Sequence, residues 1–200
     1  MVPRRQPRLV LLNGPPGIGK STLARRYVAD RPLSFCLDID GFRRLIGHWE
    51  QRQEASGLLA RSMSLAMAHT HLGRGHDVVV PQYVARPEFI EQLADAAWAS
   101  AARFFEVYLT DDKLSALDRF HRRQHDPGVA QHHAEATRAI GGAQALADMF
   151  DRIEALRASR PYGLVVHTQA GEVDAAYAAL TAALDGAASE AGAGHNAPPT

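Results

Sequence analysis

The residues best suited to do chemistry lie near the N-terminus, in the sequence GPPGIGKS that begins at Gly14. Their spacing fits the pattern G-x-x-x-x-G-K-[ST] of phosphate-binding loops. Glycines let the backbone approach a phosphate closely because they carry no Cβ, and successive backbone N–H groups can then point at the anion. A helix that starts at the end of the loop adds roughly half a positive charge. The motif therefore predicts a binding site for a nucleoside triphosphate.

The side chains after the last glycine have distinct expected roles. We expect Lys20 to reach the β- and γ-phosphates, Ser21 to ligate Mg²⁺ and Thr22 to contact the α-phosphate. A glycine-rich turn could match the pattern by chance, but here an apolar run precedes it and a helical segment follows, as the motif requires. No N-K-x-D sequence for reading guanine follows, which favours ATP. The predicted nucleotide-binding residues are Gly14, Pro15, Pro16, Gly17, Ile18, Gly19, Lys20, Ser21 and Thr22.

Two carboxylates end the second apolar run, in the sequence FCLDID. Asp38 and Asp40 are two residues apart, and residues two apart on an extended chain face the same way. Doubly wound sheets gather their ligands at the carboxyl ends of the strands. We therefore expect both carboxylates to face the cleft, where one could accept a proton from a substrate hydroxyl and the other could hold the metal through water. The alternative is that Asp40 caps a helix starting at Gly41.

Arginines form two further groups. Arg119 and Arg123 are four residues apart on a predicted helix over 112–123 and so share one face. A guanidinium can grip two oxygens of a phosphoryl group, although a basic helix end can also be merely solvated. Arg43, Arg44 and Arg86 follow the second and third apolar runs, where they could line an acceptor pocket or lie in solvent.

The elements that must position these residues alternate along the chain. Longer segments with helical spacing separate short apolar runs, which is typical of an α/β fold with a parallel sheet covered on both faces. The predicted strands cover 9–12, 33–37, 78–80, 104–109 and 164–166; the predicted helices cover 21–29, 51–72, 88–99, 112–123, 143–159 and 173–184. We expect one domain over 1–184. Residues 185–200 lack large apolar side chains and are predicted to form a disordered tail.

The amino-acid composition of the chain argues against some classes of binding partner and of location. The chain has 22 basic and 22 acidic residues and a formal net charge of zero, which argues against electrostatic binding of nucleic acid or an anionic membrane surface. No apolar run approaches the length of a membrane span. Cys36 is the single cysteine, so no intrachain disulfide can form. We expect a cytoplasmic protein.

The sequences GPPGIGKS and SFCLDID resemble the chloramphenicol phosphotransferase-like and zeta-toxin-like group of small P-loop kinases, which carry an AAA-type ATPase domain and lie close to gluconate- and shikimate-kinase-type folds. The resemblance implies a five-stranded sheet of order 2-3-1-4-5 and a helical lid at about 119–142, from which Arg119 and Arg123 would close over the phosphates. It also implies that Asp38 is the base, and that Thr168 and Gly171 lie near adenine.

One residue departs from the pattern of these kinases. They often carry an Asp at the end of the third strand that helps to hold Mg²⁺, whereas this chain has Gln82 there and its Asp77 stands at the start of that strand. The Mg²⁺ shell must then rely on Ser21, phosphate oxygens, and Asp38 or Asp40.

The sequence thus predicts an ATP- and Mg²⁺-dependent phosphotransferase. Its partner would be a small molecule with a hydroxyl group, such as an antibiotic or a sugar. The alternatives are a kinase of nucleotide sugars and a nucleotide-gated ATPase or binding protein with little transfer.

Overall fold

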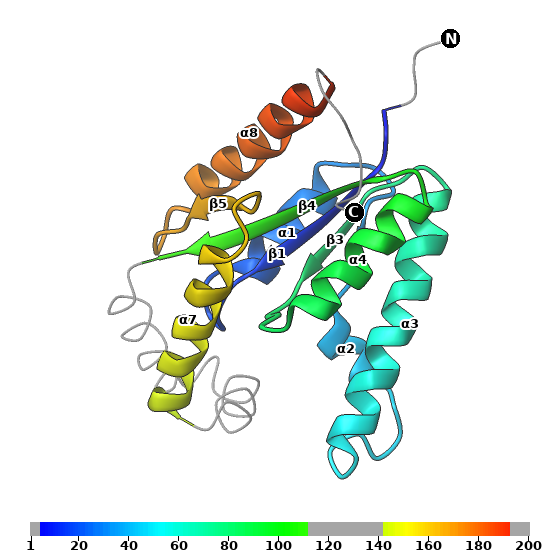
Figure 1. Cartoon of the computed structure of the whole chain (residues 1–200), viewed down its shortest axis with the longest axis vertical. Helices are drawn as coiled ribbons and strands as arrows, with labels where there is room; N and C mark the ends of the chain where they lie inside the picture. The colour runs from blue at the N-terminus through cyan, green and yellow to red at the C-terminus, as the bar shows by residue number, and fades with distance from the viewer. Residues whose placement is uncertain (1–4, 112–141, 193–200) are drawn as a thin grey trace.

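The computed structural model describes residues 5–111 and 142–192 (Figure 1). The predicted helix over 112–123 lies outside these residues. All five predicted strands are present; they are β1 (Arg8–Asn13), β2 (Phe35–Cys36), β3 (Val78–Pro81), β4 (Arg103–Thr110) and β5 (Leu164–His167). The described helices are α1 (Lys20–Ala29), α2 (Ile39–Arg43), α3 (Gln53–Gly73), α4 (Pro87–Ala99), α7 (Ala143–Ala158) and α8 (Val173–Gly192).

The strands form one parallel sheet in the order β2-β3-β1-β4-β5. In the central strand, Leu11 lies opposite Val80 of β3 on one side and Glu106 of β4 on the other. All the carboxyl ends of a parallel sheet lie on one edge, so the segments that follow β1, β2 and β3 converge there. The predicted α/β class and strand order are confirmed.

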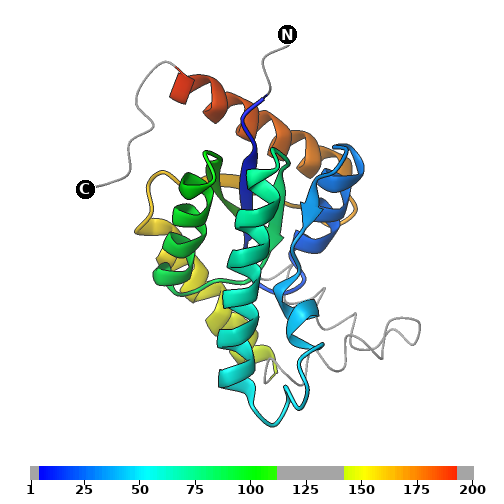
Figure 2. The same cartoon turned by 90° about the vertical axis from the view of Figure 1, so that its right-hand side faces the viewer.

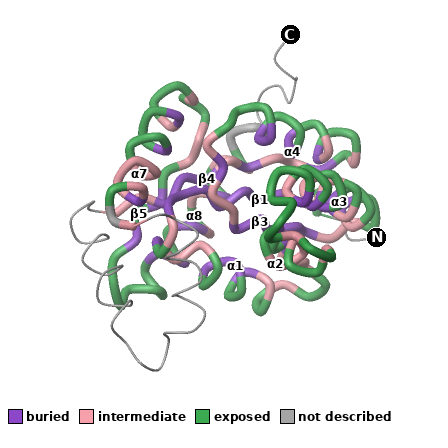
Figure 3. The backbone as a smooth tube through the Cα atoms, turned by 90° about the horizontal axis from the view of Figure 1, so that it is seen from below, coloured by how far each residue is buried: buried purple, intermediate pink, exposed green. Residues whose placement is uncertain are grey.

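Alternate residues of β1 enter two separate cores because successive side chains of a strand point to opposite faces. Leu9 and Leu11 pack in a core with buried residues of α3, α4 and α7. Val10 and Leu12 pack in a second core with residues of α1 and α8. Figure 3 shows buried residues along β1, β3 and β4 in the middle of the molecule, with exposed residues around them. A sheet covered on both faces is what the uninterrupted apolar runs predicted.

Helix α3 extends beyond the sheet. Its 21 residues span about 31 Å, whereas the four residues of β3 span about 13 Å. The N-terminal part of α3 therefore projects past the carboxyl ends of the strands, where α2 lies beside it (Figure 2). This part of α3 therefore flanks the space beyond the carboxyl ends of the strands (Figure 2).

The buried face of α3 consists mainly of small residues. Leu59 and Met63 are 50% and 45% exposed, and the helix instead buries small residues at every fourth position. These are Ser56, Ala60, Ser64 and Ala68, followed by Leu72. Small side chains let α3 lie close to α2 and α4, and this packing overrides the preference of leucine and methionine for the interior.

The disordered tail predicted over 185–200 is wrong in its first part, because α8 continues through Gly192. Alanine favours helix, and this end of α8 also has tertiary contacts. Asp185 accepts a hydrogen bond from Arg8 at 2.8 Å, and Ala187 and Ala188 pack against the second core. Residues 193–200 lie outside the described part of the chain. No helix within the described residues is long and apolar enough to cross a membrane.

Candidate active site

The phosphate loop connects β1 to α1 and depends on the conformational freedom of its glycines. Gly14, Gly17 and Gly19 have φ of 154°, 81° and 107°, a region that residues with a Cβ rarely adopt. A Cβ on Gly14 would also come within 3.0 Å of the Leu109 carbonyl oxygen. The loop is therefore closed tightly against β4, as a backbone cradle for phosphate requires.

Lys20 folds back onto this loop. Its Nζ donates hydrogen bonds to the carbonyl oxygens of Gly14 and Pro15, at 2.8 and 2.9 Å. Burial lowers the pKa of Lys20 to about 8, and the negative charge of Asp40 opposes that shift. Ser21 and Thr22 follow in the first turn of α1 and are exposed. The ammonium group and both hydroxyls thus lie at the loop, where the sequence predicted them.

Asn13, which the sequence analysis did not single out, joins the start of the loop to the segment after β3. Its Oδ1 accepts hydrogen bonds from the backbone N–H groups of Gly14 and Val84, both at 2.9 Å, and its Nδ2 donates to the Val84 carbonyl at 2.8 Å. The side chain is completely buried. The sequence feature that could have identified Asn13 is its position as a polar residue at the end of a mainly apolar strand.

The two carboxylates do not face the same way, and the sequence prediction was wrong here. β2 ends at Cys36 and α2 begins at Ile39, so Asp38 and Asp40 do not lie on one extended strand. Asp38 caps α2: its Oδ1 accepts a hydrogen bond from the Gly41 N–H at 3.0 Å, and its Oδ2 lies 4.0 Å from an Arg44 nitrogen. The capping role that the sequence offered to Asp40 thus belongs to Asp38.

Asp40 lies in the first turn of α2 and is directed toward the end of β3. Its Oδ2 accepts a hydrogen bond from Gln82 Nε2 at 3.2 Å, and its charge acts on Lys20. Gln82 Oε1 is buried and has no hydrogen-bond partner among the described residues. Gln82, which replaces the expected third-strand Asp, therefore positions one carboxylate beside the phosphate loop and presents a free acceptor atom.

Asp40 and Gln82 line a cavity of about 640 Å³ between α2, α3 and the segment after β3. Two arginines named from the sequence, Arg43 and Arg86, line this cavity, whereas Arg44 is turned toward Asp38. Arg61 on α3 and Arg152 on α7 line it as well. Sequence reasoning missed both, because a helical repeat does not fix which exposed side faces a cavity.

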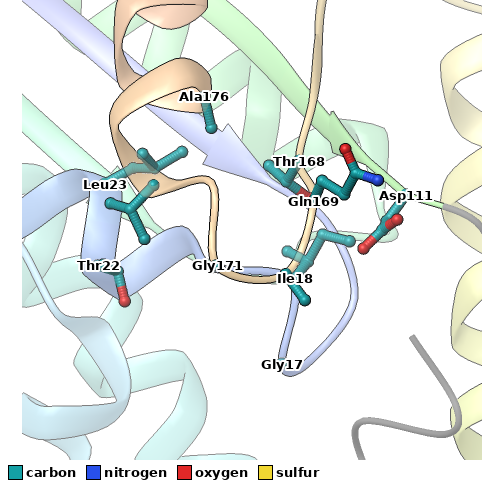
Figure 4. Close-up of a pocket in the computed structure, with 12 residues that line it drawn as sticks. Gly17, Ile18, Thr22, Leu23, Asp111, Thr168, Gln169, Gly171 and Ala176 are labelled. Atoms are coloured by element: carbon teal, nitrogen blue, oxygen red, sulfur yellow. The ribbon is translucent and has the colours of Figure 1, made fainter. Parts of the chain in front are cut away.

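A smaller cavity of about 110 Å³ lies on the other side of the loop (Figure 4). Gly17, Ile18 and Thr22 line one wall, and Thr168 and Gly171 from the segment after β5 line the other. The Thr168 N–H is held by the Thr110 carbonyl at 2.8 Å. The two residues assigned to the adenine side thus lie beside the phosphate loop.

Asp77 has a structural role. It is 4% exposed at the start of β3, and it accepts hydrogen bonds from the Arg8 N–H at 2.9 Å, from Tyr27 Oη at 2.7 Å and from Arg5.

Arg119 and Arg123 lie outside the described residues. Within residues 5–111 and 142–192, no three His, Cys, Asp or Glu side chains form a metal-binding group.

Comparisons with known proteins agree with this architecture. A family model described as an AAA domain matches residues 9–146. No curated protein sequence matches the chain.

Several solved structures share the fold over most of both chains. A gluconokinase from Sinorhizobium meliloti 1021 is 18% identical with a TM-score of 0.58, over 94% of this chain and 99% of that one. A shikimate kinase from Acinetobacter baumannii in complex with shikimate is 20% identical with a TM-score of 0.59, over 92% and 96%. A tunicamycin resistance protein from Deinococcus radiodurans is 15% identical with a TM-score of 0.55, over 90% and 95%.

The structural matches establish the fold, and the family model covers more than half of the chain. With its phosphate loop and its 2-3-1-4-5 sheet, the chain belongs to the AAA domain family and has the fold of the P-loop kinases.

Proposed function

We propose that this protein is a cytoplasmic, ATP-dependent phosphotransferase that moves the γ-phosphate to a hydroxyl group of a small molecule. The observation that carries the proposal is the position of Asp40. It lies within electrostatic reach of Lys20 in the phosphate loop and also lines a cavity of about 640 Å³. A cavity of this size suits a small-molecule ligand. A carboxylate between a phosphate site and a cavity is well placed for proton transfer from a bound hydroxyl.

In the proposed reaction, an acceptor hydroxyl in the cavity attacks the γ-phosphorus. Its proton passes to Asp40, the bond from the γ-phosphorus to the bridging oxygen breaks, and ADP leaves. Lys20 stabilises the charge on the phosphoryl oxygens, and Gln82 holds Asp40 in place. Because the protein forms no covalent intermediate, placement and electrostatics supply the acceleration.

The residues present fit a magnesium nucleotide. The glycine conformations form the cradle, and the exposed Ser21 hydroxyl is available as a ligand at the start of α1. Bound Mg²⁺ would neutralise charge on the phosphates. Ser21 would hold it together with phosphate oxygens. The metal role predicted for Asp38 is not retained, because Asp38 caps α2.

The finer assignments remain part of this proposal. They are a single domain over 1–184, the lid with Arg119 and Arg123, and membership of the chloramphenicol phosphotransferase-like branch. The name of the Deinococcus radiodurans neighbour, a tunicamycin resistance protein, supports testing antibiotics as acceptors.

The test compares two matched variants, Asp40→Asn and Asp38→Asn. Asp40→Asn should reduce phosphoryl transfer by about 10²–10⁴ while ATP still binds, since a positioned base contributes this much. Asp38→Asn should keep most activity, because Asn also caps helices well. Activity is measured as acceptor-dependent ADP release over a panel of hydroxylated compounds, and ATP binding by calorimetry. If Asp38→Asn alone abolishes transfer, the base is Asp38.

Gln82 favours a second candidate, a nucleotide-gated binding protein with little turnover. The amide at this position adds no negative charge for a metal ion. Such a protein would bind ATP with no acceptor-stimulated turnover. A third reading, a kinase of nucleotide sugars, would yield a phosphorylated uridine-diphosphate sugar, detectable by mass spectrometry.

A further inference from the structure

Two cavities of about 640 Å³ each meet beside the candidate active site. Asp40 and Gln82 line only the first cavity, and Pro87 and Gln92 line only the second. The residues that line both are Leu58, Arg61, Ala85, Arg86 and Phe89. Arg61 and Arg86 therefore lie at the wall that the two cavities share, and Asp40 lines the first cavity with them.

Positive charge is concentrated along these cavities although the chain as a whole is neutral. The first cavity is lined by Arg43, Arg61, Arg86 and Arg152, against two carboxylates, Asp40 and Glu54. The second is lined by Arg61 and Arg86 against Glu88 alone. An excess of one sign of charge in a cleft raises the local concentration of a ligand of the opposite sign.

None of these four arginines forms an ion pair with a carboxylate within the described part of the chain. Elsewhere in that part, six arginines do so; they are Arg5, Arg8, Arg26, Arg44, Arg157 and Arg160. Other described arginines, such as Arg25 and Arg52, also form no ion pair, so what distinguishes these four is that they line one cavity. Their positive charge is therefore available to a ligand in that cavity.

Arg61 and Arg86 also keep most of their hydrogen-bond donors. Arg61 donates only Nε, to the Gly57 carbonyl at 3.3 Å, and its guanidinium lies 5.9 Å from the centre of the Phe89 ring. Arg86 makes no side-chain hydrogen bond with another described residue. By contrast, Arg43 is committed to Ser56 and to the Gln53 carbonyl. The unused N–H groups of Arg61 and Arg86 match the paired oxygens of an oxyanion.

Building on the proposed function, we propose that the acceptor is itself an anion, and that Arg61 and Arg86 bind its carboxylate or phosphate group while its hydroxyl lies at Asp40. The two arginines are then positioning and specificity residues. A neutral molecule would gain no charge-assisted contact from these two guanidinium groups, so the site would favour anionic acceptors over neutral alcohols.

The experiment measures oxyanion binding directly, with the phosphate loop occupied. The full chain is saturated with Mg²⁺ and the β,γ-imido analogue of ATP and then titrated with inorganic phosphate, acetate or neutral acetamide. Binding is followed by calorimetry and by NMR of the arginine Nε–H groups. We expect saturable binding of phosphate or acetate and none of acetamide. The tighter of the two anions identifies the group that the acceptor carries.

Matched variants locate the binding. The double substitution Arg61→Gln, Arg86→Gln should weaken anion binding at least roughly tenfold, as loss of charge-assisted contacts does. Arg157→Gln, on α7 and lining neither cavity, should bind as the parent does. No saturable anion binding, or equal binding by the double variant and the parent, overturns the proposal. Failure of the ATP analogue to bind refutes the proposed function instead, and the difference between parent and double variant then still tests the anion site.

Discussion

At the residue scale, the phosphate loop uses its own carbonyl groups to hold Lys20. The ammonium group is partly buried against Gly14 and Pro15, and the loss of solvent around it lowers its pKa to about 8. Nucleotide phosphates would provide stronger acceptors and would favour the protonated form. Binding and protonation of Lys20 are therefore coupled.

This coupling predicts how ATP affinity depends on pH. Above the lowered pKa, free Lys20 loses its proton, and ATP must restore it on binding. We expect affinity to fall about tenfold between pH 7 and pH 9, because each pH unit above a pKa reduces the protonated fraction tenfold. Calorimetry in buffers of different ionisation enthalpy should also show proton uptake at pH 9.

Lys20→Ala provides the control for this prediction. The variant should bind ATP more weakly than the parent, and its residual binding should lack the decline above pH 8. An affinity for ATP that is equal in parent and variant would contradict the assignment of the phosphate loop.

At the element scale, the site depends on how β1, α2 and the segment after β3 are joined. Asn13 links the loop to Val84, and Gln82 links that same segment to Asp40 on α2. The phosphate loop and the larger cavity are thus connected through a few polar contacts, which are buried at Asn13 and exposed between Gln82 and Asp40. Sequence periodicity predicted the elements but could not predict these links, which join residues 71 and 42 positions apart.

Asn13→Ala tests the first link. The substitution leaves the buried N–H groups of Gly14 and Val84 without their acceptor, and each unsatisfied buried group costs about 1–3 kcal/mol. We expect the free energy of unfolding to fall by about 2–4 kcal/mol in urea denaturation. An exposed polar residue, Gln144→Ala, serves as a control and should change stability by less than about 0.5 kcal/mol. A loss for Asn13→Ala no larger than that of the control would show that the link carries little stability.

At the scale of the whole molecule, the last turns of α8 close the fold at the amino ends of the strands. Arg8 at the start of β1 binds Asp185, and Arg103 at the start of β4 donates to the carbonyl oxygen of Ala188 at 2.6 Å. Figure 1 shows α8 running along the sheet toward the end where the chain begins. The segment predicted as tail therefore belongs to the structural domain up to residue 192.

Two truncations test this boundary. Removing residues 185–200 deletes the partner of Arg8, the carbonyl acceptors of Arg103 and the packing of Ala187 and Ala188. We expect a loss of about 1–3 kcal/mol in the free energy of unfolding. Removing only 193–200 should leave stability and melting temperature unchanged. Equal stability of both truncated chains would place the end of the domain at Leu184.

The sequence by itself determined the phosphate loop, the alternation of strands and helices, and the parallel sheet covered on both faces. These features arise from local conformational preferences and from the side-chain periodicity of single elements, which neighbouring residues specify. Only the tertiary structure decided which carboxylate faces the loop, which arginines line the cavities, and where α8 ends. Because β2 ends at Cys36 and α2 begins at Ile39, Asp38 caps α2 and Asp40 contacts Gln82. Contacts between residues distant in the chain fix such orientations, and no short-range pattern in the sequence records them.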